Sequence, residues 1–134
     1  MTYLLDSNVW VALLRGTKPQ VAARFRAAPS ADLRVCSVIV AELRYGCARS
    51  AKSAANRAAV DALLAPYPSL PFDDAAVDSF VSVRTHLEAL GMPIGPYDLQ
   101  IAAIALINAC TLVTHNQAEF SRLPGLLLED WEVP

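Results

Sequence analysis

The stretch YLLDSNVWVALL, residues 3–14, carries one charged side chain, Asp6, inside an otherwise apolar run. Its first residues, Tyr3–Leu5, predict a short buried strand, and the segment from about Asn8 to Leu14 predicts a helix. One interpretation is that Asp6 or Ser7 only caps this helix, because side-chain oxygens there accept hydrogen bonds from the free N–H groups of the first turn. The other interpretation places Asp6 in a binding site at the end of the strand.

Outward from this stretch, short apolar strands alternate with helices. Further strands are expected at Leu33–Cys36, Leu70–Phe72, Thr111–Thr114 and Leu126–Leu128. Further helices are expected at about Gln20–Ala27, from a Ser37 cap to Gly46 or Arg49, at Ser53–Leu64, from an Asp73 or Asp74 cap to Leu90, and from Tyr97 or Asp98 to Ala109. The alternation predicts an α/β fold with a parallel sheet covered by helices on both faces. In such sheets ligands bind at the carboxyl ends of the strands, where the strand order switches, and Asp6 follows the first strand.

Length and composition narrow the class of protein. The chain of 134 residues, 54% of them hydrophobic, predicts one domain, residues 1–134, with a sizeable core. Its most apolar long segment, Leu99–Val113, is too short to cross a bilayer, and the first residues lack a signal-peptide pattern. The three cysteines show no C-x-x-C spacing, which argues against a disulfide framework or a zinc site and favours the reducing cytoplasm. His86 and His115 have no second ligand at metal spacing and are expected on the surface or in loops.

Charge is divided unevenly along the chain. Nine of the 11 basic residues and only three acids lie in the first 57 positions, for a charge of +6, and the remaining residues carry −8. This division predicts a face that meets a polyanion or an acidic partner. The alternative is that the charges mix once the chain folds.

Three carboxylates occur near the expected starts of helices: Asp6, Glu42 and Asp98. Taken singly, Glu42 could be a solvated surface acid and Asp98 a helix cap favoured by the helix dipole. Taken together, they are expected at the carboxyl edge of the sheet, where two charges about 4 Å apart repel by roughly 4 kcal/mol at an effective dielectric near 20. A divalent cation would offset that repulsion, and an all-oxygen site suits Mg²⁺ or Mn²⁺. Such an ion holds a phosphate and lowers the pKa of a bound water, which predicts phosphate chemistry.

Four segments also carry a family resemblance. They are LLDSNVWVALL (4–14), CSVIVAELRYG (36–46), GMPIGPYDLQIAAIA (91–105) and LVTHNQAEFSRLPGLLLEDW (112–131). In this order and spacing the chain resembles PIN-domain ribonucleases, specifically the VapC-type toxins of bacterial toxin–antitoxin modules. The resemblance implies a three-layer α/β/α fold with about five parallel strands, a homodimer, and a VapB-like antitoxin with which the chain forms a hetero-oligomer.

The resemblance also implies site residues and a reaction. Asp6, Glu42 and Asp98 would form the acidic cluster, lined by Asn8 and Thr114. The expected activity is Mg²⁺- or Mn²⁺-dependent endoribonuclease cleavage by a metal-activated water, leaving 5′-phosphate and 3′-hydroxyl ends on tRNA, ribosomal RNA or messages. Asp6 and Asp98 are the expected direct metal ligands, with Glu42 bound through water or orienting the attacking water.

Two further sets of residues follow from this hypothesis. Many relatives place an Asp where this chain has Asn116, and Glu119 would supply a carboxylate instead if the segment after Thr114 turns helically. The alternative is that Asn116 only caps that turn and Glu119 is solvated. From the basic part of the chain, Arg15, Arg44 and Arg49 are the residues expected to contact RNA or antitoxin.

Two rival functions are compatible with an acid after the first strand. An aspartyl-phosphate receiver or phosphatase would need a second Asp nearby and a late Lys, but residues 6–8 read Asp-Ser-Asn and no Lys follows Lys52. A non-catalytic module that binds nucleic acid or protein would use the three acids only as helix caps. Carboxamide substitutions that leave metal binding intact would favour that second rival.

Overall fold

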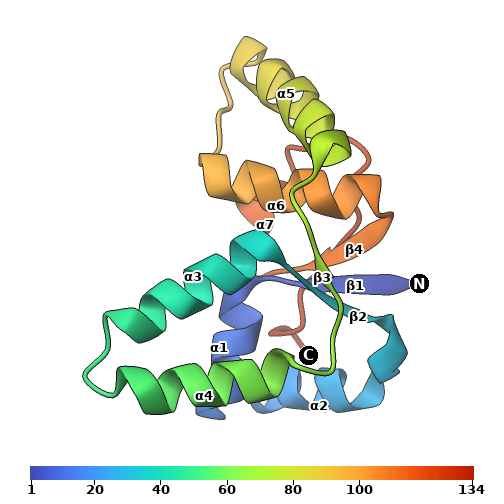
Figure 1. Ribbon diagram of the computed structural model, residues 1–134. Coiled ribbons are helices and arrows are strands. Elements are labelled where there is room, and N and C mark those ends of the chain that lie inside the picture. The colour runs from blue at the N-terminus through green and yellow to red at the C-terminus, as the bar shows by residue number, and fades with distance from the viewer.

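A five-stranded parallel sheet forms the centre of the computed structural model, which describes residues 1–134 (Figure 1). Its strands are β1 (Thr2–Leu5), β2 (Leu33–Cys36), β3 (Ser69–Leu70), β4 (Cys110–Val113) and β5 (Leu128–Glu129). They lie in the order β3-β2-β1-β4-β5, and every pairing is parallel. The predicted fold class is therefore confirmed.

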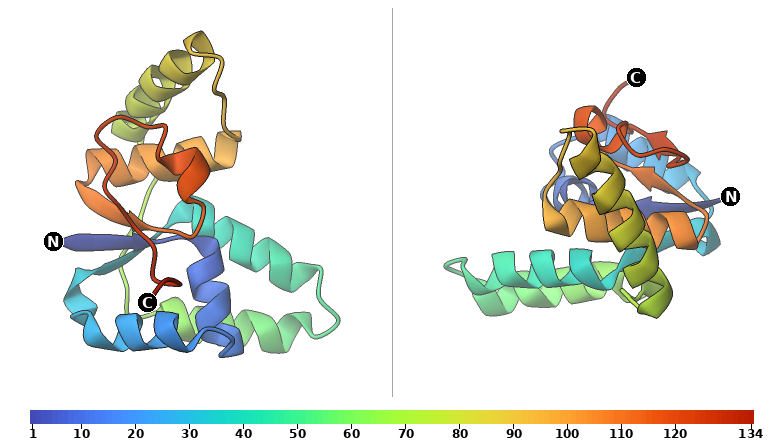
Figure 2. Two further views of the ribbon diagram at one scale, coloured as in Figure 1. Left: turned by 180° about the vertical axis from the view of Figure 1, so that it is seen from behind. Right: turned by 90° about the horizontal axis from the view of Figure 1, so that it is seen from above.

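Seven α-helices surround the sheet. They are α1 (Ser7–Arg15), α2 (Pro19–Ala27), α3 (Ser37–Ala48), α4 (Ser53–Leu64), α5 (Asp74–Ala89), α6 (Pro96–Ile107) and α7 (Gln117–Phe120). Figures 1 and 2 show α5 and α6 on one face of the sheet and α1, α2 and α4 on the other, which gives the expected three layers. Helices α3 and α4 pack side by side and extend beyond the edge of the sheet.

The core explains why the chain is so apolar. The two central strands contribute four fully buried side chains, Leu4, Leu5, Leu112 and Val113. Helix α6 is buried almost all round over Ile101–Ala105, because it lies between the sheet and α5. A helix enclosed in this way has no polar face to keep in water. None of the seven helices has the length and hydropathy of a membrane span.

Several predicted boundaries differ from the observed ones. The third and fifth strands are two-residue segments, Ser69–Leu70 and Leu128–Glu129, because only these residues pair with β2 and β4. The expected Ser37 cap is wrong: Cys36 occupies the N-cap position of α3, and the Ser37 hydroxyl donates to the carbonyl of Leu70 at 3.5 Å. A short 3₁₀ turn at Ser30–Asp32, unpredicted, precedes β2.

The strand order places a crevice beside β1. Strands β2 and β3 lie on one side of β1, and β4 and β5 on the other, so the order switches between β1 and β4. The N–H of Asp6 continues the pairing by donating to the carbonyl of Val113 at 2.9 Å. Asp6 and Thr114 thus leave neighbouring strands at the same edge, which is where parallel sheets bind ligands.

Candidate active site

Asp6 both caps a helix and lies at this switch point. Its side chain is 9% exposed. One carboxylate oxygen, Oδ1, accepts from the Ser7 N–H at 2.8 Å, and Oδ2 accepts from the hydroxyl of Thr114 at 2.8 Å. Burial raises the pKa of Asp6, and these two hydrogen bonds oppose that rise. The cap interpretation and the site interpretation are therefore both correct for this residue.

Glu42 reaches the same place from α3. It lies at the exposed rim, and its Oε2 accepts from the Ser7 hydroxyl at 3.0 Å. Partial burial raises the pKa of Glu42, the Ser7 hydrogen bond lowers it, and the charge of Asp6 raises it further. Ser7 thus bonds to both acids, through its N–H to Asp6 and through its hydroxyl to Glu42. Sequence reasoning considered Ser7 only as a helix cap, and its place directly after Asp6 was the available signal.

Asp98 completes the group from the first turn of α6. Partial burial raises the pKa of Asp98, and the charges of Asp6, Glu119 and Glu42 and a hydrogen bond with Glu119 raise it further, to about 6 in all. The charge of Asp6 therefore raises the pKa of both Glu42 and Asp98, and the charge of Glu42 also raises that of Asp98. Each of the three acids lies at or near the N-terminus of a different helix. Glu119 is a fourth carboxyl group beside Asp98.

The segment after β4 supplies the remaining polar groups. The Thr114 hydroxyl accepts from the N–H of Asn116 at 3.0 Å, and helix α7 begins one residue later. The Asn116 amide donates to Glu119 at 3.3 Å, so the helical turn brings Glu119 to the site side of this segment. Asn116 precedes α7 without a side-chain cap hydrogen bond. Asn8 is exposed in the first turn of α1, next to Ser7.

The donor set fits a hard divalent cation. Asp6, Glu42 and Asp98 take part in none of the ion pairs of the chain. Burial raises the pKa of all three acids, and the charges of neighbouring acids raise the pKa of Glu42 and Asp98 further. The hydrogen-bond partners of Asp6 and Glu42 are hydroxyl and backbone N–H groups. An oxygen-only group of this kind suits Mg²⁺ or Mn²⁺ rather than a thiolate-bound metal.

Comparison with known proteins agrees with this geometry. The PIN domain family matches residues 3–126. The chain belongs to the PIN-domain family. It is 33% identical over 133 residues to "Ribonuclease VapC2" of Rickettsia felis, covering 98% of this chain and 99% of that protein. It is 32% identical to "tRNA(fMet)-specific endonuclease VapC" of Salmonella typhimurium, covering 98% of each chain.

Comparison with solved structures also finds VapC-type proteins similar to this PIN domain. The DNA-bound VapBC of Salmonella typhimurium superposes with a TM-score of 0.91 at 30% identity, covering 98% of both chains. VapBC2 of Rickettsia felis, bound to a DNA fragment from its promoter, gives a TM-score of 0.89 at 32% identity, covering 98% of this chain and 99% of that one. PIN-domain nucleases depend in general on divalent metal ions.

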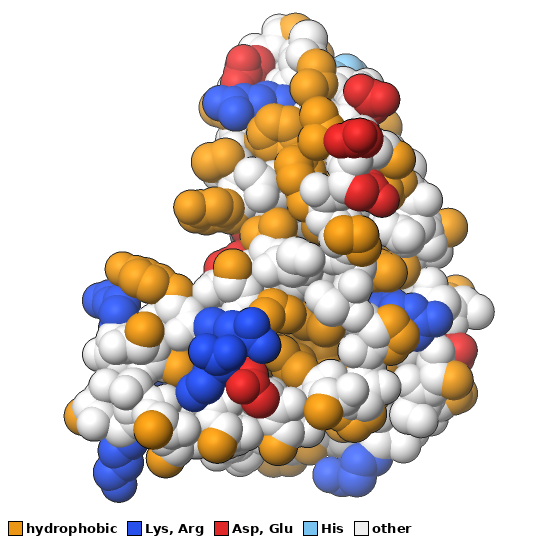
Figure 3. Space-filling model, in the orientation of Figure 1, with side chains coloured by type: hydrophobic (Ala, Val, Ile, Leu, Met, Phe, Trp, Pro, Cys, Tyr) orange, Lys and Arg blue, Asp and Glu red, His pale blue; other side chains and the backbone are white.

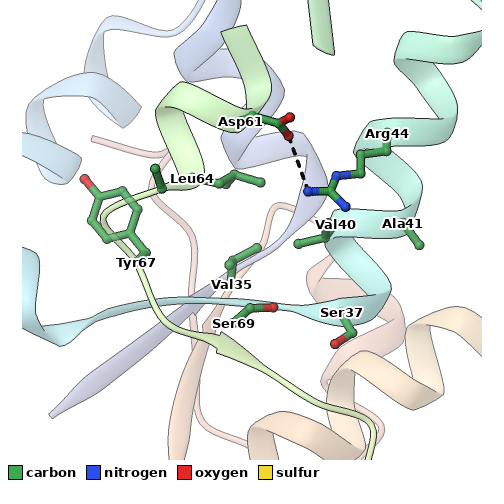
Figure 4. A pocket seen from close by; sticks show the side chains of 10 residues that line it. Val35, Ser37, Val40, Ala41, Arg44, Asp61, Leu64, Tyr67 and Ser69 are labelled. Atoms are coloured by element: carbon green, nitrogen blue, oxygen red, sulfur yellow. Dashed lines mark hydrogen bonds and ion pairs between the residues drawn. The ribbon is translucent and has the colours of Figure 1, made fainter. Parts of the chain in front are cut away.

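The three arginines expected to contact RNA or antitoxin lie in three different surroundings. Arg15 lines a cavity of about 390 Å³ together with Ser7 and Glu42. Arg44 instead faces the groove between α3 and α4, where it bonds to Asp61 at 3.5 Å (Figure 4). The Arg49 guanidinium lies 5.5 Å from the ring centroid of Tyr45.

The uneven charge along the sequence is partly neutralised by folding. Four bases from the first 57 residues pair with acids from the rest of the chain: Lys18 with Glu132, Arg24 with Glu129, and Arg44 and Arg57 with Asp61. Mixing of charges, the alternative to a single basic face, therefore accounts for part of the asymmetry.

A second acidic group, which we call the C-terminal cluster, joins His115 to Asp130 and Glu132. The Nδ1 atom of His115 lies 2.9 Å from Asp130 Oδ2 and 3.7 Å from Glu132 Oε2, and Lys18 Nζ lies 3.1 Å from Glu132 Oε1. The three potential ligand atoms of His115, Asp130 and Glu132 fall within 4.8 Å of one another. Sequence spacing missed this cluster, because its members come from the segment after β4 and from the chain end.

Proposed function

We propose that this PIN domain is a Mg²⁺- or Mn²⁺-dependent endoribonuclease and the toxin of a VapBC toxin–antitoxin pair. The observation that carries the proposal is the meeting of Asp6, Glu42 and Asp98 at the switch point of the sheet without a basic partner. The VapC ribonuclease relatives support the same activity. Because these relatives are named as nucleases, they favour a catalytic role for the acids over a purely structural one, and a nuclease over a receiver or phosphatase.

Each acid has a distinct role in this proposal. Asp6 and Asp98 would hold the cation directly, and Glu42 would bind it through water or orient the attacking water. When bound, the cation supplies charge neutralisation, a contact to a phosphate oxygen and a more acidic water. Hydrolysis would form a bond from the water oxygen to phosphorus and break the bond from phosphorus to the 3′ oxygen, which takes up a proton. The products are a 5′-phosphate and a 3′-hydroxyl. Asn116 and Glu119 are secondary lining residues beside Asp98, and Asn8 lies at the outer edge.

Hydroxyl groups fix the orientation of the acids before any ligand arrives. Thr114 and the Ser7 N–H hold one oxygen each of Asp6, so its carboxylate plane cannot rotate without breaking a hydrogen bond. The Ser7 hydroxyl holds Glu42 toward Asp6. Such preorganisation keeps the functional groups in place at little further entropic cost.

The partners follow from the same relatives. Several solved structures that match this chain are VapBC complexes, which supports a VapB-like antitoxin as its partner. We propose a homodimer as well, because helix α5 and the segment after it expose the apolar side chains of Val77, Val81, Leu90 and Met92. Apolar side chains gather along α5 in Figure 3. We place the protein in the cytoplasm, where its three buried free cysteines stay reduced.

Cleavage of a defined RNA tests the proposal. Initiator tRNA is the first substrate to use, because two relatives at 32% and 30% identity carry tRNA(fMet) in their names. Purified, antitoxin-free protein is expected to cut a tRNA(fMet) transcript with Mg²⁺ or Mn²⁺, to stop in EDTA, and to leave ligatable 5′-phosphates. Asp6→Asn serves as the control. Cleavage that persists in EDTA, or products with 2′,3′-cyclic phosphates, would contradict the metal-dependent mechanism.

A further inference from the structure

A groove of about 600 Å³ lies beside the carboxylates, between α3 and the start of α6. Glu42 belongs both to this groove and to the acidic site, so the groove begins where the proposed reaction takes place. The surface in Figure 3 is hollowed between the part of the molecule that holds α3 and the part that holds α5 and α6. We call it the tyrosine groove, after two of its lining residues, Tyr45 and Tyr97.

The two tyrosines are unusually open to solvent. Tyr45 and Tyr97 are each 65% exposed, whereas the aromatic rings of Trp10 and Phe120 are fully buried. Tyr45 comes from the second half of α3, and Tyr97 immediately precedes Asp98. Exposed aromatic rings beside a site cost solubility without adding to the core, and they are typical of binding surfaces.

A positive charge lies beside one of the two tyrosine rings. The guanidinium of Arg49 lies over the Tyr45 ring, at 5.5 Å from its centroid. A cation next to an aromatic ring matches a nucleotide, whose base stacks on the ring and whose phosphate meets the charge. Gln100 adds a side-chain amide to the lining, which can both donate to and accept from the edge of a base.

We propose that the tyrosine groove binds an unpaired nucleobase of single-stranded RNA next to the scissile phosphodiester, by stacking on Tyr45 and Tyr97. This inference rests on the proposed nuclease function and deepens it, because it assigns the two side chains that hold a base beside the cleaved bond. A base inside a duplex has both faces covered, whereas a base in a loop can turn outward and stack on a protein ring.

Binding is measured with the Asp6→Asn protein, so that the RNA stays intact. The probe is a single-stranded RNA 12-mer containing one 2-aminopurine, a fluorescent base that loses emission when it stacks. Titration is expected to quench the probe and to favour it over the same strand in a duplex. Tyr45→Ala and Tyr97→Ala are each expected to weaken binding roughly 5- to 100-fold, the range for loss of one stacked base.

Matched variants separate stacking from other causes. Tyr97→Phe keeps the ring and is expected to bind like the parent, whereas Tyr97→Leu keeps apolar volume without a ring and is expected to lose both affinity and quenching. Leu127→Ala removes a side chain that is 59% exposed elsewhere and is expected to change nothing. Melting temperature and Mn²⁺ affinity in the Tyr97 variants without Asp6→Asn report whether Asp98 stays in place.

Salt dependence distinguishes the charge from the rings. Arg49→Gln is expected to reduce the slope of log affinity against log salt, because one phosphate contact is lost. Tyr97→Ala is expected to lower affinity at every salt concentration with the slope unchanged. A Tyr97→Ala effect that disappears at high salt would contradict stacking.

Three results would overturn the inference. The first is unchanged affinity and quenching in both tyrosine-to-alanine variants. The second is a change in the molecular mass of the tyrosine-to-alanine variants by light scattering while their RNA binding is unaffected. That result would make a second copy of the chain the occupant of the groove. The third is loss of antitoxin binding alone, which would make the groove part of the antitoxin interface. A wild type that binds the probe but cleaves no RNA would contradict the proposed function, and the stacking result would still be readable.

Discussion

Two groups of carboxylates contact the segment after β4, and they differ in their bonding partners. In the C-terminal cluster, Glu132 faces Lys18 at 3.1 Å, and Asp130 faces His115 at 2.9 Å. At the switch point, Asp6, Glu42 and Asp98 face hydroxyls, amides and one another. The first group has basic partners in the same chain, a lysine beside Glu132 and a histidine beside Asp130, and the second has none.

The difference indicates which group is built for a ligand. An acid beside a base adds modest stability and attracts a cation only weakly, because the base already balances part of its charge. Unpaired, partly buried acids raise one another's pKa values and destabilise the apo protein, and such perturbed groups concentrate at functional sites. We therefore propose that the C-terminal cluster mainly holds the chain end against α2 and that the switch-point acids serve the reaction.

The largest expected effect separates the two groups by activity. Asp6→Asn and Asp98→Asn are each expected to lower RNA cleavage by at least about 100-fold, since loss of a ligand exceeds the 10- to 100-fold cost of losing a residue that only supports one. Metal-free stability is expected to stay equal or to rise, because one repelling charge is gone. Asp130→Asn, the control from the C-terminal cluster, is expected to keep cleavage near the parent rate. An unfolded or fully active Asp6→Asn protein would contradict the role of that residue.

Much of this arrangement could be predicted from the chain alone. The alternation of apolar strands and helices gives the α/β class, and Asp6, Glu42 and Asp98 were each found by their place near a helix start. Ser7 and the C-terminal cluster were not found, because their contacts join residues 35, 15 and 114 positions apart. The two short strands β3 and β5 depend on pairing with neighbours, so their boundaries are not encoded locally.

A smaller effect, on metal affinity, is expected at Asn116, where many relatives are expected to carry an aspartate. Asn116→Asp places a second carboxylate beside Glu119 and is expected to tighten Mn²⁺ binding by about 1 kcal/mol, roughly fivefold, the scale of one added charge at partial exposure. If Glu119 already compensates, Glu119→Gln will weaken binding in the parent and matter less in the Asn116→Asp protein. Calorimetry of the four combinations checks this. Equal affinities throughout would restrict the site to Asp6, Glu42 and Asp98.

The pH dependence of apo stability is a further difference between the groups. Folding raises the pKa of Asp98 from 3.8 to about 6, so the folded state binds this proton more tightly than the unfolded state. The resulting stabilisation is complete below about pH 4 and is lost as the pH rises through about 6. The metal-free melting temperature is thus expected to fall between about pH 4 and about pH 6, less steeply in Asp98→Asn. Equal slopes in the two proteins would contradict the raised pKa.

The smallest expected effect comes from the paired cluster. Lys18→Gln removes an ion pair whose lysine side chain is 46% exposed, so the free energy of unfolding is expected to drop by only about 0–1 kcal/mol. Chemical denaturation checks the stability, and RNA cleavage is expected to stay at the parent rate. A loss of several kcal/mol would mean that the C-terminal cluster contributes more to the fold than its exposure indicates.

Calorimetric titration of Mn²⁺ into three proteins, the parent, Asp6→Asn and a His115→Ala/Asp130→Asn double variant, tests directly which acidic group takes the cation. The switch-point account predicts that the parent and the double variant bind Mn²⁺ with the same affinity and that Asp6→Asn loses at least tenfold, about 1.4 kcal/mol. Binding that survives in Asp6→Asn and disappears in the double variant would place the metal at the C-terminal cluster and contradict the account.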